Sequence, residues 1–97
     1  MHKRTKALEI SQKVRKRVLE RDKWCIVCGS PNGLPNAHYI SRGQGGLGIE
    51  ENIVTLCFSC HNRMDHSTER TKLKQVVSEY LESNYPNFTD EMRCYKK

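Results

Sequence analysis

The chain has 97 residues, of which only 36% are hydrophobic, so a single domain with a small apolar core is expected. Lys and Arg number 17 against 11 Asp and Glu, and the net charge of +6 favours a polyanionic partner such as nucleic acid. No stretch is apolar enough to span a membrane, and no hydrophobic segment follows the basic N-terminus as in a secretory signal. We therefore expect a cytoplasmic protein without a membrane partner.

The first 23 residues hold nine of the 17 basic residues. Residues 1–10 show no sustained periodicity, and we expect a basic flexible arm there. From residue 11 onward, Val14 and Val18 continue a helical spacing that starts at Ile10, with basic residues on the other faces. This pattern predicts a basic amphipathic helix that ends near Lys23.

Two β segments and two further helices are predicted downstream. Residues 34–41 and 53–56 have β-compatible content and flank a loop with four glycines, which favours a hairpin-like unit. A short helix is expected over residues 60–65. Over about residues 68–84, apolar residues at i, i+3, i+4, i+7 and i+8 predict an amphipathic helix that closes the core. One more helical turn is expected after Thr89.

Four cysteines form two Cys-x2-Cys pairs with 28 residues between them. Each pair can bend around a metal, and four thiolates fill a tetrahedral zinc site without leaving room for water, which indicates a structural zinc. A redox protein is a weaker interpretation, since it would need an exposed reactive pair in a βαβ context. Cys94 has no partner spacing and is expected to be a free thiol. The predicted zinc ligands are Cys25, Cys28, Cys57 and Cys60.

His38, Asn52 and His61 lie among these pairs in the order Cys pair, His, Gly-Gly, Asn, Cys pair, His. With this pattern the chain resembles the zinc-ribbon subgroup of HNH (ββα-metal) endonucleases, and in particular small phage and prophage HNH proteins. The resemblance covers roughly residues 14–66. It implies an α+β fold: a ββα-metal core over about residues 24–66 with a structural zinc site of four cysteines, between the N-terminal basic helix and the C-terminal amphipathic helix. Residues 11–97 would form one nuclease domain.

The resemblance also implies a chemistry, namely metal-dependent hydrolysis of DNA phosphodiester bonds by a one-metal mechanism. His38 would be the general base, Asn52 would brace the loop, and His61 would bind a catalytic divalent cation such as magnesium, manganese or nickel. DNA is the implied partner. A role in phage DNA packaging, beside a terminase, is suggested by the likeness to phage proteins.

The chain departs from the family at Ala37, where a second metal ligand usually precedes the base. If the alignment is anchored on Ile40 instead, His38 becomes the ligand and Tyr39 takes the position of the base. Asp65, one helical turn after His61, or the adjacent His66 could complete the metal site.

Basic residues beside such a site would bind DNA phosphates with little base readout. Alone, they would more often be a solvated helix face. The rival interpretation of the whole chain is a non-catalytic zinc-ribbon adaptor for nucleic acid, in which Ala37 marks a lost metal site. The expected DNA contacts are Lys13, Arg15, Lys16, Arg17, Arg21, Arg42 and Arg63.

Overall fold

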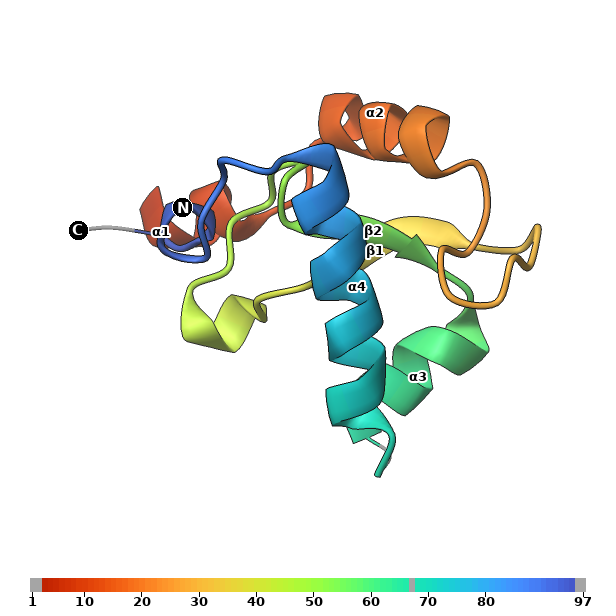
Figure 1. The fold of residues 1–97 in the computed structure, drawn as a ribbon. Helices are drawn as coiled ribbons and strands as arrows, with labels where there is room; N and C mark the ends of the chain where they lie inside the picture. The colour runs from red at the N-terminus through yellow and green to blue at the C-terminus, as the bar shows by residue number, and fades with distance from the viewer. Residues whose placement is uncertain (1–2, 67, 96–97) are drawn as a thin grey trace.

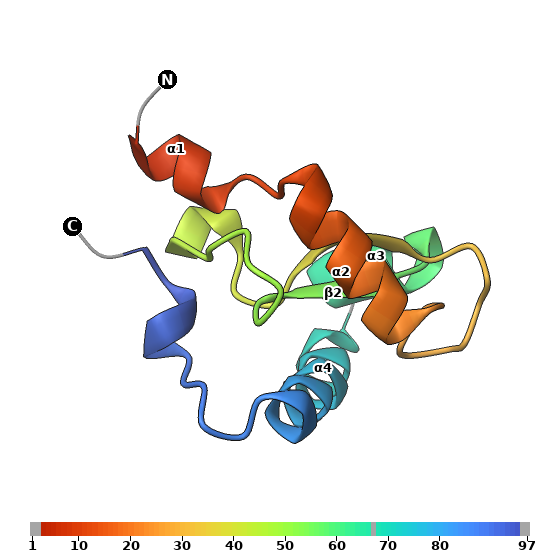
Figure 2. The same ribbon diagram turned by 90° about the horizontal axis from the view of Figure 1, so that it is seen from above.

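The computed structural model describes residues 3–66 and 68–95, and of residues 3–5 and 66 only the backbone. Two antiparallel strands form a small sheet with α2 on one side and α3 on the other (Figure 1). The first and the last described segments of the chain lie on the same side of the molecule (Figures 1 and 2). No helix within the described ranges is long and apolar enough to cross a membrane.

Helix α2, Gln12–Asp22, confirms the predicted basic amphipathic helix. It starts where the side chain of Ser11 accepts a hydrogen bond from the backbone N–H of Val14, at 3.1 Å. It ends at Lys23, which has a φ of 68° and donates its N–H to the carbonyl of Leu19. Val18 is fully buried, whereas the side chain of Leu19 is 43% exposed, so the apolar stripe is narrow.

Strands β1, Leu34–His38, and β2, Ile53–Leu56, pair antiparallel. Ala37 lies opposite Val54 and His38 opposite Ile53, with a register irregularity between Leu34 and Ala37. Because side chains alternate along a strand, Ala37 and His38 point to opposite faces of the sheet. The first strand is shorter than the predicted residues 34–41, since a 3-10 turn, η1 (Arg42–Gln44), follows soon after it.

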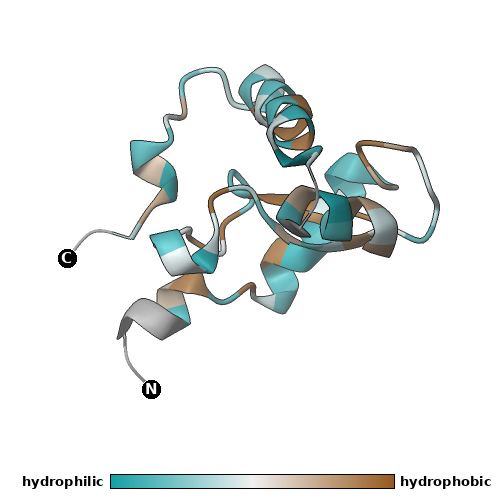
Figure 3. Ribbon diagram, turned by 90° about the horizontal axis from the view of Figure 1, so that it is seen from below, coloured by the Kyte–Doolittle hydropathy of each residue, from teal (hydrophilic) through white to brown (hydrophobic). Residues whose placement is uncertain are grey.

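The core lies on the Ala37 face of the sheet. Helix α3, Phe58–His66, contributes Cys60 and Met64, and helix α4, Arg70–Asn84, contributes three residues at helical spacing. Hydrophobic positions, brown in Figure 3, run along the strands and part of α4. A short 3-10 helix η2, Glu91–Arg93, forms the turn expected after Thr89. The three α4 residues in the core are Leu73, Val77 and Leu81.

A buried polar network ties α2 to the rest of the fold. The carboxylate of Asp22 accepts hydrogen bonds from the Arg21 guanidinium, at 2.6 Å and 3.1 Å, from the N–H of Thr55, at 2.8 Å, and from the Tyr80 hydroxyl. Burial and the bond to Asp22 raise the pKa of Tyr80 to about 12, so its hydroxyl stays protonated and donates at neutral pH. Since Asp22 is fully buried, the bond network compensates for its removal from water.

The structure differs from expectation at the amino terminus, where no element was assigned. Helix α1, Lys3–Leu8, occupies this segment, and the side chain of Leu8 is only 3% exposed. The backbone N–H of Gly48 donates to the carbonyl of Ala7 at 3.1 Å. Contacts with the glycine loop therefore order this segment, and such long-range contacts leave no local periodicity in the sequence.

Candidate active site and metal centre

The four cysteines of the two Cys-x2-Cys pairs come together in space. The first pair follows α2, and the second opens α3, directly after β2. Their sulfur atoms all lie within 4.8 Å of one another, and the Sγ atoms of Cys28 and Cys57 are 3.6 Å apart. Zinc–sulfur bonds of about 2.3 Å in a tetrahedron place sulfurs about 3.8 Å apart. The cluster of Cys25, Cys28, Cys57 and Cys60 thus fits the predicted structural zinc, and Cys94 lies outside it.

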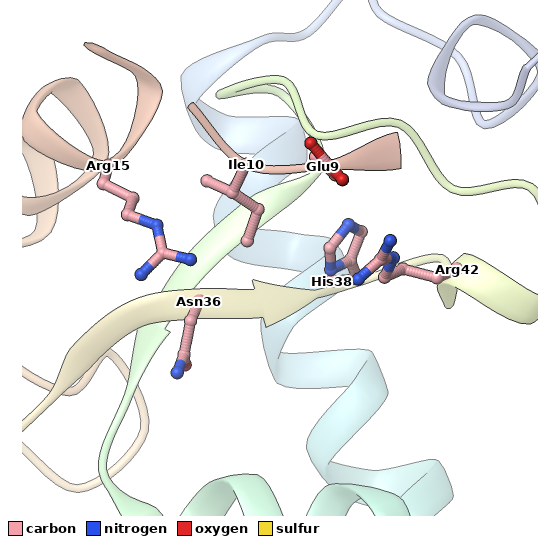
Figure 4. Close-up of a pocket in the computed structure, with 6 residues that line it drawn as sticks. All are labelled: Glu9, Ile10, Arg15, Asn36, His38 and Arg42. Carbon is pink, nitrogen blue, oxygen red and sulfur yellow. The ribbon is translucent and has the colours of Figure 1, made fainter. Parts of the chain in front are cut away.

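His38 lies on the opposite face of the sheet from the core, in a pocket of about 380 Å³. The end of β1, the α1–α2 connection and the first turn of α2 form the walls. His38 and Arg42 stand at one end of the pocket, with Arg15 on the far side of Ile10 (Figure 4). The pocket is lined by Glu9, Ile10, Arg15, Asn36, His38 and Arg42.

The imidazole of His38 is held by a backbone group. Its Nε2 lies 2.9 Å from the carbonyl oxygen of Leu8. A carbonyl only accepts hydrogen bonds, so Nε2 carries the proton and Nδ1 has the free lone pair when the ring is neutral. Burial lowers the pKa of His38, and the nearby charges of Arg42 and His61 lower it further against the raising effect of the Leu8 carbonyl. A neutral ring with a fixed tautomer can accept a proton at Nδ1.

Asn52 is fully buried and fastens the loop between the strands. Its Oδ1 accepts from the N–H of Ile40 at 2.9 Å, and its Nδ2 donates to the carbonyls of Ile40 and Leu47 at 3.2 Å and 2.9 Å. A Cβ at Gly46 would lie 1.7 Å from the carbonyl oxygen of Ile40, so only glycine fits this close approach. The Gly-Gly and Asn elements of the motif together fix the loop that follows His38.

His61 and Asp65 form a pair on α3. The Nε2 of His61 lies 3.3 Å from an Asp65 carboxylate oxygen, as the i, i+4 spacing predicts. Both side chains are partly exposed and line a hollow of about 150 Å³. Two donors suit a hard divalent cation that keeps several of its waters. The side chain of His66 lies outside the described residues, and within the described ones the cysteines form the group of three or more metal-binding side chains.

Because Ala37 departs from the family pattern, two alignments are possible, and they differ in whether His38 or Tyr39 takes the position of the base. Ala37 is fully buried in the core and offers no ligand. Tyr39 packs against that same core, and its ring lies 5.8 Å from the Arg93 guanidinium and 5.9 Å from the Lys74 ammonium. It lines a hollow with α4 residues, whereas His38 lines the pocket with Arg15 and Arg42. The geometry favours His38 over Tyr39 as the base.

Most of the basic residues expected to bind DNA are exposed at the surface. Those of α2, Lys13, Arg15, Lys16 and Arg17, are exposed, as is Arg42. Arg17 also reaches Glu50, with 3.4 Å between Nη1 and Oε1, and Arg63 pairs with Glu69.

Arg21 departs from that expectation. Its guanidinium donates to the carbonyls of Glu50 and Ile53, both at 2.7 Å, and to the Tyr85 hydroxyl at 3.1 Å. Its side chain is only 13% exposed. Arg21 is therefore a structural residue, and the helical pattern misassigned it because a charged side chain in a helix ordinarily faces water.

The Leu8 carbonyl is the part of the site that the sequence did not reveal. Every residue carries a carbonyl, so no side-chain pattern marks this one. The one sign in the sequence was Gly48, because a Cβ there would lie 2.0 Å from the carbonyl oxygen of Glu9. A glycine at such a position indicates a backbone passing close by, without saying which one.

Comparison with known proteins agrees with this geometry. Residues 25–67 match the family model for HNH endonuclease, a segment that runs from the first zinc cysteine to just past α3. This segment of the chain is therefore similar to an HNH domain, and the similarity supports a nuclease type of function in general terms. The search of curated proteins gives no match.

Proposed function

We propose that the protein is a metal-dependent DNA endonuclease in which His38 activates the attacking water. The observation that carries this proposal is the bond between Nε2 of His38 and the carbonyl of Leu8, in a pocket with two arginines. A histidine held in one tautomer, with a lowered pKa and a free Nδ1, has the properties of a general base at neutral pH.

In this mechanism Nδ1 of His38 takes a proton from water as the water attacks phosphorus. Arg15 and Arg42 lie in the same pocket, where their charges would neutralise the phosphate and stabilise the negative charge that builds up during attack. Asn52 contributes by keeping the loop after β1, and with it Arg42, in place.

His61 and Asp65 would hold the catalytic divalent cation, with His66 as a further candidate ligand. Such an ion stabilises the leaving 3′-oxygen and polarises the phosphate. A site with only two described protein donors binds weakly by itself, so DNA phosphate and water would complete the coordination. Magnesium, manganese and nickel are the ions to test.

The exposed basic face of α2 would bind neighbouring phosphates and position the DNA with weak sequence preference. Nicking or cutting of both strands is compatible with this arrangement. From the sequence resemblance alone, we further propose action in the cytoplasm and in phage DNA packaging, beside a terminase. Co-purification with a terminase subunit would test that partner.

The test is cleavage of supercoiled plasmid by zinc-loaded protein, with and without added magnesium, manganese or nickel. We expect nicked or linear product only with the added ion, and loss of activity when a chelator is present. A His38→Ala protein purified in parallel controls for contaminating nucleases. Equal cleavage by wild type and this variant would contradict the proposal.

The second candidate is a zinc-dependent adaptor that binds nucleic acid without cutting it. It is favoured by Ala37, since a fully buried alanine stands where the family places a metal ligand. An adaptor would bind plasmid tightly in the same experiment and leave it supercoiled with all three ions.

A further inference from the structure

One face of α3 is left open to solvent beside the His61–Asp65 pair. Phe58, His61, Asn62 and Asp65 follow each other at i, i+3, i+4 and i+7 and line the hollow of about 150 Å³. The opposite side of the helix carries Cys60 and Met64, which are buried in the core with the other cysteines and the sheet.

Phe58 is the most exposed large hydrophobic side chain in the described residues, at 82%. Single exposed apolar residues are common and need no explanation. This one, however, contributes almost nothing to the core and stands at the edge of the hollow that contains His61 and Asp65. The packing of the core does not require an aromatic ring at this position. A ligand with a flat apolar face, in contrast, could pack against such a ring.

We propose that Phe58 stacks on a nucleobase next to the cleaved phosphate, and that the preferred substrate is DNA with an unpaired base at that point. The inference rests on the proposed nuclease function, which places the phosphate near His61. Aromatic side chains bind bases in this way wherever the bases are unstacked, independently of their sequence. In an intact duplex both faces of each base are covered, and a ring must first open a base step.

One feature of this face and one of the whole chain fit a nucleotide better than a protein partner. The amide of Asn62, one residue beyond His61, can both donate to and accept from the edge of a base. The net charge of +6 attracts the phosphates that accompany it. The substrates that follow are single-stranded, gapped or mismatched DNA.

The experiment measures binding, so that it does not depend on cleavage. Zinc-loaded protein without added magnesium is titrated with oligonucleotides carrying 2-aminopurine, either single-stranded, opposite a gap or in a perfect duplex. The fluorescence of 2-aminopurine reports stacking of that base. The variants are Phe58→Ala, Phe58→Leu, which keeps an apolar side chain without a ring, and Phe58→Tyr, which keeps the ring.

We expect Phe58→Ala and Phe58→Leu to bind single-stranded and gapped DNA about 5- to 150-fold more weakly than wild type, the range for loss of one aromatic–base stack. Phe58→Tyr should keep both affinity and fluorescence change, and duplex affinity should vary little. Wild-type affinity and fluorescence in Phe58→Ala would overturn the inference, as would a Phe58→Leu protein that behaves like wild type. Base stacking without any cleavage would contradict only the nuclease proposal.

Discussion

The side chain of His38 is fixed from two directions, because its backbone pairs with Ile53 in the sheet and its ring bonds to the carbonyl of Leu8. The next residue, Tyr39, packs against the core together with Lys74 and Arg93. Neighbouring residues on the chain therefore belong to different parts of the molecule, and of these two only His38 faces the basic pocket.

Replacing His38 by Ala should lower the cleavage rate by about 100- to 10,000-fold, the usual contribution of a positioned base. Affinity for the divalent cation should change little, since His61 and Asp65 would hold it. Single-turnover rates and calorimetric titration of the ion measure the two effects. Tyr39→Phe is the control and should cut like wild type; loss of activity in that variant would favour the other alignment.

The pH dependence of cleavage should follow the same residue. A general base acts in its neutral form, so the rate should rise with pH as His38 loses its proton and then reach a plateau. Burial lowers its pKa below the ordinary value of about 6.5, so the rise should be complete by neutral pH. Single-turnover cleavage rates measured from about pH 5 to 8, a range that spans the ordinary histidine value, check this pH dependence. A midpoint of the rise above about pH 7 would contradict a lowered pKa of His38.

At the scale of residues, the sequence marks candidate side chains by their type and order, and it does not mark backbone groups. His38, Asn52, His61 and the cysteines were recognisable because their types and order form a pattern. The Leu8 carbonyl was not, since it belongs to the backbone of a residue without any motif. Arg21 was misassigned because its burial depends on Glu50, Ile53 and Tyr85, which come together only in the folded chain.

Helix α2 links the site to the expected DNA surface, because Arg15 lies in the His38 pocket while Lys16 is exposed nearby. Reversing both charges, with Arg15→Glu and Lys16→Glu, should weaken binding of all DNA sequences alike. The salt dependence should also become shallower, by about 0.9 in the log–log slope for each phosphate that the variant no longer binds. Fluorescence anisotropy at several salt concentrations measures both.

The matched control is Arg70→Glu with Lys72→Glu, which changes the net charge equally on the exposed side of α4. Arg17 is left unchanged because it pairs with Glu50 and its reversal would add repulsion there. If the α4 variant weakened binding as much as the α2 variant, the effect would come from net charge and not from a defined face.

The contact of the glycine loop with the α1–α2 connection offers a second test at the scale of elements. A Cβ in Gly48→Ala would lie 2.0 Å from the carbonyl oxygen of Glu9, which must push the connection away and take the Leu8 carbonyl from His38. We expect slower cleavage and loss of the Nε2–H tautomer in the nitrogen NMR shifts of His38. Zinc content should stay unchanged.

Gly43→Ala is the control for this substitution, because its Cβ would have only the Ser41 Oγ nearby, at 3.9 Å. It should cut like wild type. A Gly48→Ala protein with normal activity and the normal tautomer would show that the Leu8 carbonyl does not orient His38.

The elements themselves were largely predictable. Both strands, the basic helix that begins near residue 11 and the closing helix follow from residue content and periodicity. Helix α1 could not be predicted, because its six residues are too few for a helix that is stable alone, and the contacts that hold it come from the glycine loop.

The whole molecule depends on the cysteine cluster, because its apolar core consists of few side chains from α3, α4 and the sheet. Structural zinc contributes on the order of 10–16 kcal/mol in small domains, which equals or exceeds the about 5–15 kcal/mol that separates a folded from an unfolded domain. A chain of this size with such a core is not expected to fold without the metal.

We therefore predict about one zinc per chain, and unfolding after substitution of Ser for Cys25, Cys28, Cys57 or Cys60. Metal analysis together with circular dichroism measures both effects. Cys94→Ser is the control and should keep zinc and fold, because Cys94 lies outside the cluster. Folded protein without zinc, or equal sensitivity at Cys94, would contradict the ligand set.

The carbonyl of Leu8 lies 17 positions before Cys25, where the match to the HNH model begins. A graft of residues 25–67 into another scaffold would move His38, Asn52 and the zinc ligands together, yet it would leave behind the group that sets the tautomer of the base. Such a chimera should bind zinc and cleave poorly. The smallest module that could transfer the proposed nuclease activity is thus larger than the motif by which it is recognised, and it would have to begin ahead of Leu8.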